Sequence, residues 1–183
     1  MVCLGGGVSG AEWRSLGPAP ITSGPYSGRL AAVVCSPTDA NRYFVGAADG
    51  GVWRTDDGGA SWTPLTDLLP RCAIGALALD PLDENTIYAG SGEANFANHS
   101  RYGVGLYKST DGGESWFVLA ADAFSGRAFS RIVVDPVNSE TLYAAITHAG
   151  GFPEMVAARG HPQADGPLGV FKSTDGGVNW THL

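Results

Sequence analysis

Thr55-Asp56-Asp57-Gly58-Gly59-Ala60-Ser61-Trp62 is an octet whose pattern the chain carries three times. The other copies are Ser109-Thr110-Asp111-Gly112-Gly113-Glu114-Ser115-Trp116 and Ser173-Thr174-Asp175-Gly176-Gly177-Val178-Asn179-Trp180. Each copy places a hydroxyl residue first, Asp third, Gly fifth, Ser or Asn seventh and Trp last. Three copies of such a pattern indicate a repeat architecture.

The octet has the chemistry of a tight hairpin turn. An Asp side chain accepts hydrogen bonds from nearby main-chain N–H groups, the hydroxyl two residues earlier can do the same, and Gly adopts positive φ. The Trp then opens the next strand and offers a large apolar face to a neighbouring layer. We therefore predict a structural role, not a catalytic or metal-binding one, for the residues that define the pattern: Thr55, Asp57, Gly59, Trp62, Ser109, Asp111, Gly113, Trp116, Ser173, Asp175, Gly177 and Trp180.

A second block repeats between the octets at constant spacing. It is apolar and ends in Pro, and an aromatic residue follows seven positions after each Pro. The Trp of each octet comes 11 residues after a strand glycine, whereas the segment between the aromatic residue and this glycine grows from 7 to 17 to 26 residues. The three blocks are Val33-Val34-Cys35-Ser36-Pro37, Leu77-Ala78-Leu79-Asp80-Pro81 and Val133-Val134-Asp135-Pro136, with aromatic residues Phe44, Tyr88 and Tyr143.

These spacings predict an all-β chain of three four-stranded antiparallel blades of a β-propeller, at about 29–69, 70–122 and 123–183, with less than about a tenth of the residues in helices. Residues 1–28 form an N-terminal segment with an outer strand near Trp13, because Trp13-Arg14-Ser15-Leu16 shares the Trp-x-x-Leu pattern that follows each octet turn. Length varies only between the second and third strands of a blade. One face of the disc therefore carries the inserts, which is where function is usually placed.

The octet resembles the Asp-box, also called the bacterial neuraminidase repeat. This motif is found on β-propellers such as sialidases, xyloglucan-hydrolysing glycosidases and sortilin-like domains. The resemblance spans most of the chain and implies the propeller fold, with the Asp as a turn residue far from the active face. It carries little information about function.

Three blades are too few to close a propeller, since closed propellers generally have four to eight. The sequence leaves two interpretations open. The chain is either the N-terminal portion of a longer propeller, with blades missing at its C-terminus, or it self-associates so that two copies supply six blades. In both cases the blade edges of a single chain are exposed.

Composition narrows the possible partners. The formal net charge is −7 and the pI is near 4.9, so the attraction to phosphate that drives nucleic-acid binding is absent. No apolar run approaches the roughly 18 residues that would span a membrane.

Cys3, Cys35 and Cys72 show no metal-ligand spacing, and we expect neither a metal nor a cofactor, nor a disulfide between Cys35 and Cys72. Met1–Gly10 is not a complete signal peptide, although the resemblance favours an extracellular or secreted protein.

The two longer inserts hold the candidate binding residues. Aromatic rings beside carboxylates and amides suit a sugar or a peptide, although such residues can also be solvated loop residues that pack on themselves. Arginines at the starts of the three inner strands could together hold a carboxylate or could each pair with local acids. The candidates are Glu93, Phe96, His99, Arg101 and Tyr102 in the second blade, His148 and Phe152 in the third, and the arginines Arg29, Arg71 and Arg127.

Two carboxylates are weak catalytic candidates. Asp49-Gly50-Gly51 is similar to the pattern of a catalytic Asp in xyloglucan-hydrolysing propellers, but that pattern has one residue between the Asp and the glycines. Glycoside hydrolysis needs two carboxyl groups, and Glu93 is the best available acid, since the family's own partner acid comes from a second propeller. We therefore favour a non-catalytic extracellular scaffold that binds a glycan or a protein. The alternative is a fragment of a glycoside hydrolase, xyloglucanase-like or sialidase-like.

Overall fold

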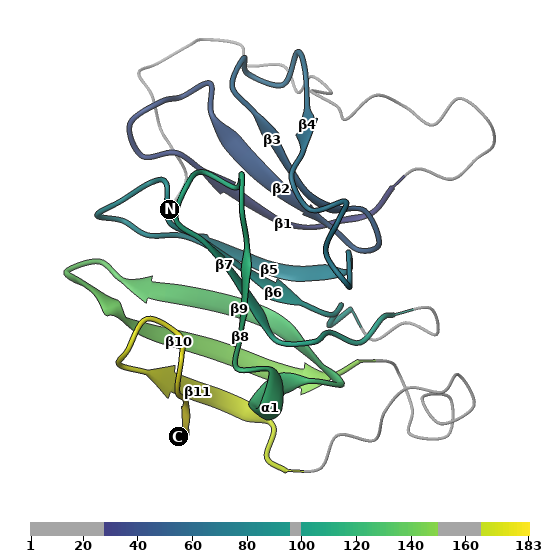
Figure 1. Ribbon diagram of the computed structural model, residues 1–183, viewed down its shortest axis with the longest axis vertical. Helices are drawn as coiled ribbons and strands as arrows, with labels where there is room; N and C mark the ends of the chain where they lie inside the picture. Colours follow the sequence, from purple (N-terminus) through teal and green to yellow (C-terminus); the bar gives the residue numbers. More distant parts are fainter. Residues whose placement is uncertain (1–27, 96–99, 150–165) are drawn as a thin grey trace, which may run out of the picture.

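A computed structural model describes residues 28–95, 100–149 and 166–183 of the chain. It contains three four-stranded antiparallel sheets, which we call blades 1, 2 and 3 and which confirm the predicted all-β architecture (Figure 1). Within each blade the strands are hydrogen-bonded in chain order. Blade 1 comprises β1 (Leu30–Cys35), β2 (Tyr43–Ala47), β3 (Gly51–Thr55) and β4 (Thr63–Pro64); blade 2 comprises β5 (Ile74–Leu79), β6 (Ile87–Ser91), β7 (Leu106–Ser109) and β8 (Phe117–Leu119); blade 3 comprises β9 (Arg127–Asp135), β10 (Asn138–His148), β11 (Gly169–Ser173) and β12 (Thr181–His182).

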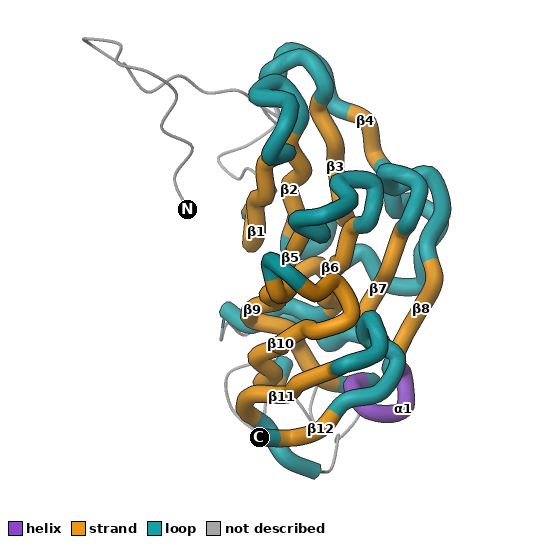
Figure 2. Tube along the Cα trace, turned by 90° about the vertical axis from the view of Figure 1, so that its left-hand side faces the viewer, coloured by secondary structure: helices purple, strands orange, loops and turns teal. Residues whose placement is uncertain are grey.

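The blades stack face to face with their inner strands side by side. Figure 2 shows β1, β5 and β9 along one side of the stack and the outer strands β4 and β8 along the other. β5 packs against both β1 and β9. The predicted spacings produce the same register in every blade, because Phe44, Tyr88 and Tyr143 each pair with the residue that lies three positions before the Pro.

Each blade has a forward face toward the next blade and a rear face toward the preceding one, since alternate strand residues point to opposite sides. The forward face of blade 1 (Val34, Phe44, Val52 and Arg54) meets the rear face of blade 2 (Leu77, Ala89 and Tyr107) in one apolar cluster. The forward face of blade 2 (Ala78, Tyr88, Leu106 and Lys108) meets the rear face of blade 3 (Ile132, Ala144 and Phe171) in another. The core is therefore two inter-blade layers.

A single helical turn, α1 (Ala121–Phe124), connects blades 2 and 3. Phe124 is fully buried and makes edge-to-face contacts with Phe129, Phe171 and Trp180, at ring-centroid distances of 5.1, 5.2 and 5.5 Å. The sequence did not predict this element, because four residues are too few to show a helical period. The expectation of little helix is nevertheless confirmed in the described part of the chain.

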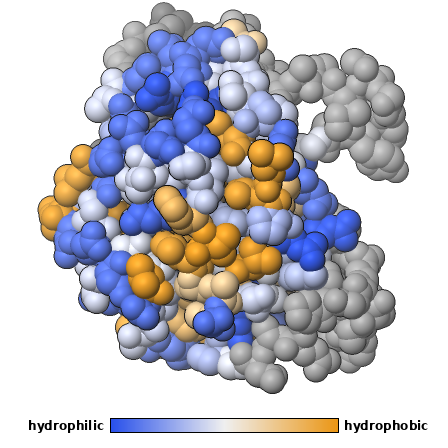
Figure 3. All heavy atoms as spheres, in the orientation of Figure 1, coloured by the Kyte–Doolittle hydropathy of each residue, from blue (hydrophilic) through white to orange (hydrophobic). Residues whose placement is uncertain are grey.

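The two edges of the stack differ in their connections. In Figure 1 the hairpin turns between first and second strands lie on the left, and the connections between second and third strands lie on the right. We call the right-hand edge the loop face. Figure 3 shows hydrophilic side chains over blade 1 and a gathering of apolar ones around β8, whose Phe117 and Val118 are exposed. In the described residues, no helix has the length and apolar character needed to cross a membrane.

Candidate functional site

Ser91 organises the base of the blade 2 loop. Its Oγ accepts hydrogen bonds from the Val104 and Gly105 N–H groups at 2.9 and 3.1 Å and donates to the Gly105 carbonyl oxygen. The side chain is fully buried. Ser91 therefore joins the start of this loop to its end.

Glu93 lies two residues into this loop and is fully buried. Its Oε1 atom forms an ion pair with Arg29, which precedes the inner strand of blade 1, and accepts a hydrogen bond from Asn95 Nδ2 at 3.1 Å. Among the described residues, the Oε2 atom has no hydrogen-bond partner. A buried carboxylate is stable only when it is paired, so this contact fixes the loop of blade 2 to blade 1.

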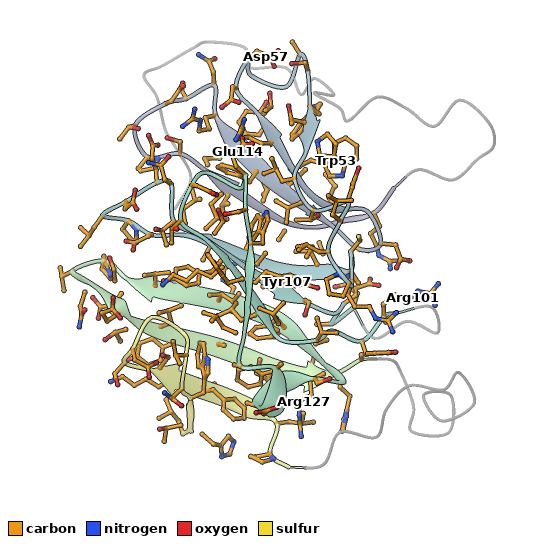
Figure 4. All side chains as sticks on the ribbon, in the orientation of Figure 1. Trp53, Asp57, Arg101, Tyr107, Glu114 and Arg127 are labelled. Carbon is orange, nitrogen blue, oxygen red and sulfur yellow. The ribbon has the colours of Figure 1, made fainter. Side chains whose placement is uncertain are left out.

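Arg101 and Asp49 form a second contact between blades 1 and 2. Arg101 Nε donates to Asp49 Oδ1 at 3.3 Å, and both side chains are about half exposed, at 49% and 57%. Asp49 stands in the short connection between β2 and β3, and Figure 4 shows Arg101 at the outer edge of the loop face. This pair presents both hydrogen-bond donors and acceptors to solvent.

Tyr102, the next residue, contacts the connection that enters blade 2. The Arg71 guanidinium lies 4.3 Å from the centre of the Tyr102 ring and also donates to the Tyr102 hydroxyl. The Arg71 main chain is held in turn by Tyr107, whose hydroxyl accepts from the Arg71 N–H at 3.2 Å and donates to its carbonyl oxygen at 3.1 Å. Burial raises the pKa of Tyr107, so the hydroxyl keeps its proton for this bond.

The three arginines that precede or open the inner strands have three different sets of partners. Arg127 is buried, and its Nη1 donates to the Pro167 carbonyl oxygen at 3.0 Å, whereas Arg29 contacts Glu93 and Arg71 contacts Tyr102. His148 is exposed and pairs with Arg127 in the β9–β10 ladder. Phe96, His99, Phe152, Trp13 and Cys3 lie outside the described residues.

The three octet turns lie away from the loop face and share one hydrogen-bond pattern. Thr55 Oγ1 donates to Asp57 Oδ1 at 2.8 Å and accepts from the Gly59 N–H at 2.9 Å, and Asp57 accepts from both the N–H and the hydroxyl of Ser61. The bonds recur around Asp111 and Asp175, with Asn179 replacing Ser in the last turn. Figure 4 shows Asp57 at the far end of blade 1 from Arg101.

These bonds stabilise the charged form of the three carboxylates. They lower the pKa of Asp57 and Asp111 to about 2, chiefly through the hydroxyls of Ser61 and Ser115. The pKa of Asp175 falls to about 2 chiefly through the Asn179 N–H. All the donors come from the turns themselves, which is a structural use of the carboxylate.

The loop face can bind a polar ligand, but its two candidate carboxylates differ in access. Asp49 is exposed and next to an arginine, whereas Glu93 is enclosed and paired. Within residues 28–95, 100–149 and 166–183, no group of three or more His, Cys, Asp or Glu side chains is placed to hold a metal ion.

The sequence did not predict that Ser91 and Tyr107 support this face, and it did not predict the contact between Asp49 and Arg101. A buried Ser before a loop Gly is a signal too common to be specific.

Comparison with curated proteins finds similarity to xyloglucanases. Xyloglucanase Xgh74A of Acetivibrio thermocellus is 26% identical over 185 residues, which cover 89% of this chain and 20% of that protein. A probable oligoxyloglucan-reducing end-specific xyloglucanase of Neosartorya fischeri is 26% identical in an alignment of 205 positions, which covers 89% of this chain and 24% of that protein. A xyloglucanase of Hypocrea jecorina is 29% identical in an alignment of 149 positions, which covers 71% of this chain and 16% of that protein. The chain thus spans about a fifth of the length of these relatives, and no protein-family model matches it.

Solved structures agree on the fold. An ancestral GH74 enzyme superposes with a TM-score of 0.64 at 24% identity, covering 94% of this chain and 19% of that one. YCF48 bound to D1 peptide gives a TM-score of 0.53 at 14% identity, with 85% and 41% covered. Both are β-propeller structures, so the chain has the predicted β-propeller fold.

Proposed function

We propose that this chain is part of a glycoside hydrolase of the xyloglucanase type and that its loop face contacts the glycan. The observation that carries this proposal is the similarity to xyloglucanases along 89% of the chain. It reverses the preference for a non-catalytic scaffold that the residues alone suggested. We further propose that the three octet turns are Asp-boxes with a structural role, and that the protein acts outside the cell.

The geometry of the loop face supports contact with a sugar. Sugar hydroxyls both donate and accept hydrogen bonds, and the exposed Asp49–Arg101 pair offers both kinds of partner. Tyr102, which follows Arg101 in the chain, adds a half-buried aromatic ring held in place by Arg71. A flat apolar surface next to oriented polar groups is the usual composition of a small-ligand site.

Hydrolysis needs two carboxyl groups, and among the described residues of the loop face only one of the two candidates, Asp49, is exposed. Asp49 is the one that solvent and substrate can reach, and we assign it the role of general base. Glu93 is fully buried and ion-paired with Arg29, so its carboxyl group is enclosed and is not placed to reach a substrate oxygen. We therefore propose that Glu93 positions the loop and that the acid comes from the remainder of a longer protein.

Binding is tested first. Titration calorimetry of the chain with xyloglucan oligosaccharides should give saturable binding, and Tyr102→Ala should weaken it about tenfold, or about 1.4 kcal/mol. Phe117→Ala is the control, because Phe117 is an exposed aromatic residue on β8, away from the loop face. Equal loss in both variants, or no binding by the wild-type chain, would contradict a glycan site at Tyr102.

Catalysis is tested in the full-length protein. Asp49→Asn should lower kcat for xyloglucan by about 10² or more, the usual contribution of a general base. Asp56→Asn is the matched control, because Asp56 is also an exposed aspartate held by arginines, Arg42 and Arg54, but it lies in an octet turn. Glycan binding with no hydrolysis would favour the alternative of a non-catalytic scaffold, which the burial and ion pairing of Glu93 support. Unchanged hydrolysis in Asp49→Asn would remove its assigned role.

A further inference from the structure

Asp-Gly is an aspartyl dipeptide prone to rearrangement of the main chain, because Gly has no side chain to shield its nitrogen. Within the described residues such a pair occurs at the centre of each octet turn and once in the connection between β2 and β3: Asp57-Gly58, Asp111-Gly112, Asp175-Gly176 and Asp49-Gly50. A further pair, Asp165-Gly166, lies partly outside the described residues. The four described pairs have the same covalent chemistry, so differences in their reactivity come from the fold.

The rearrangement begins with attack of the Gly main-chain nitrogen on the Asp side-chain carbon Cγ. The N–Cγ bond forms, and the carboxyl OH and the amide proton leave as water, which closes a succinimide ring. Water then adds to either ring carbonyl carbon. Addition at Cγ restores the aspartate, whereas addition at the main-chain carbon gives isoaspartate, in which the chain runs through the side chain. The reaction therefore needs an available N–H and a carboxyl group that can take up a proton.

The octet turns withhold both groups. Each turn Gly donates its N–H to a carbonyl oxygen in the hairpin of the first two strands of its blade: Gly58 to Asn41, Gly112 to Asn85 and Gly176 to Glu140, at 3.0, 2.9 and 3.0 Å. The turn carboxylates have a pKa of about 2, so near neutral pH their protonated form is about 60 times scarcer than that of an aspartate at the ordinary 3.8. The fold thus protects all three pairs in the same way.

Asp49-Gly50 has neither protection. The N–H groups on either side, of Ala48 and Gly51, donate to carbonyl oxygens at 2.9 and 2.7 Å, but among the described residues the Gly50 N–H has no acceptor. Within the described residues the Asp49 carboxylate accepts one hydrogen bond, at Oδ1 from Arg101 Nε at 3.3 Å, and the side chain is 57% exposed. A carboxylate held at one atom can turn its Cγ toward the next main-chain nitrogen.

We propose that Asp49 is a site of spontaneous succinimide and isoaspartate formation, from which the fold protects the octet aspartates. The change lengthens the main chain by one carbon and moves the free carboxylate from the side chain to the main chain. Loss of xyloglucan hydrolysis would follow, and this consequence alone rests on the proposed function of Asp49. The exposure that the reaction needs is no greater than the access to Asp49 that a substrate needs in the longer protein.

Incubation of the folded full-length protein in water labelled with heavy oxygen tests the proposal, because each ring opening incorporates one labelled oxygen. Peptide mapping should find label and isoaspartate at Asp49 at least about tenfold above each octet aspartate, a conservative part of the roughly 60-fold difference in protonated carboxyl. A protease that cuts before aspartate fails at isoaspartate and identifies it. In urea all four pairs should react at similar rates, because the protection belongs to the fold.

Gly50→Ala is the matched variant, since it keeps Asp49 and shields the attacking nitrogen with a methyl group. A Cβ atom there lies 3.1 Å from Ala47 Cβ, a contact that a small shift relieves, and the variant should lose most of the label. In Asp49→Asn the same attack releases ammonia and regenerates aspartate and isoaspartate, so this variant should regain hydrolysis on storage.

Equal labelling of Asp49 and the octet aspartates in the folded protein would overturn the proposal. So would a difference that persists in urea, which would make the local sequence its cause, or full labelling of Gly50→Ala. Isoaspartate at Asp49 with unchanged hydrolysis would support the modification and would remove only the general-base role of Asp49.

Discussion

Gly75 lies in the inner strand of blade 2, at a point where a methyl group has no room. A Cβ atom added there would lie 2.1 Å from the Phe129 carbonyl oxygen and 2.3 Å from the Gly92 carbonyl oxygen. Both are main-chain atoms and cannot rotate away as the end of a flexible side chain would. Real Cβ atoms essentially never come closer than 3.0 Å, so Gly75→Ala must move β9 away from β5 by about 0.9 Å and the blade 2 loop by about 0.7 Å.

We expect this change to lower the free energy of unfolding by about 3 kcal/mol, the upper end of the usual cost of overpacking. For a domain of this size the thermal midpoint should fall by roughly 6 to 12 °C. The urea midpoint should fall by about 1.5 M, if the m value is near 2 kcal/mol/M. Because Gly92 directly precedes Glu93, the displaced loop should also weaken the binding of xyloglucan oligosaccharides.

Gly28→Ala is the control, because a Cβ atom at Gly28 would meet nothing within 4 Å. Its unfolding curve should stay within about 0.5 kcal/mol of the wild-type curve. If calorimetry and urea unfolding gave Gly75→Ala the same stability as Gly28→Ala, the close contact between the inner strands of blades 2 and 3 would be refuted.

Three further predictions follow from the turns, the loop base and α1. The turn aspartates have a pKa of about 2, below the ordinary 3.8, so the stability that they add is complete above about pH 4 and is lost as the pH falls toward 2. The urea midpoint should therefore fall over this pH range, and Asp111→Asn should make that fall smaller. Ser91→Ala removes the acceptor of the buried Gly105 N–H and of the part-buried Val104 N–H, and it should cost about 1–3 kcal/mol by urea unfolding, with weaker xyloglucan binding. Ser130→Ala, on an exposed serine, should cost less than about 1 kcal/mol. Phe124→Ala should cost about 3–5 kcal/mol by calorimetry, and Phe117→Ala, at an exposed site, about 0.5 or less.

The strand order and the turns were predictable because their causes are local. The constant spacings place Phe44, Tyr88 and Tyr143 opposite equivalent residues of the first strand, as the three registers confirm. The hydrogen bonds that the hydroxyl and Asp side chains of each octet turn make join residues at most four positions apart, from Thr55 to Gly59 or from Asp57 to Ser61. A pattern this short contains all the partners of these side chains, so the turn could be predicted from it. The bond from the Gly58 N–H to the Asn41 carbonyl oxygen, at 3.0 Å, joins the turn to the hairpin between β1 and β2 and does not follow from the octet.

The candidate site was predictable only as a region. Inserts between second and third strands indicated the loop face, and Glu93, Arg101 and Tyr102 were selected there for their side-chain chemistry. What each does depends on its partner. Glu93 is buried because Arg29 of another blade reaches it, and Arg101 is held by Asp49, 52 residues away. Neither contact follows from spacing within a repeat.

The sequence by itself therefore determined the repeat, the blade and its turns, because those depend on hydrogen bonds and side-chain alternation within a few residues. Tertiary structure alone decided which carboxylate is buried and which is exposed. It also placed Phe124, in an element too short for any sequence period, between three aromatic rings of blade 3. The physical reason is that burial and ion pairing are set by how one blade packs on the next, and that packing joins residues far apart in the chain.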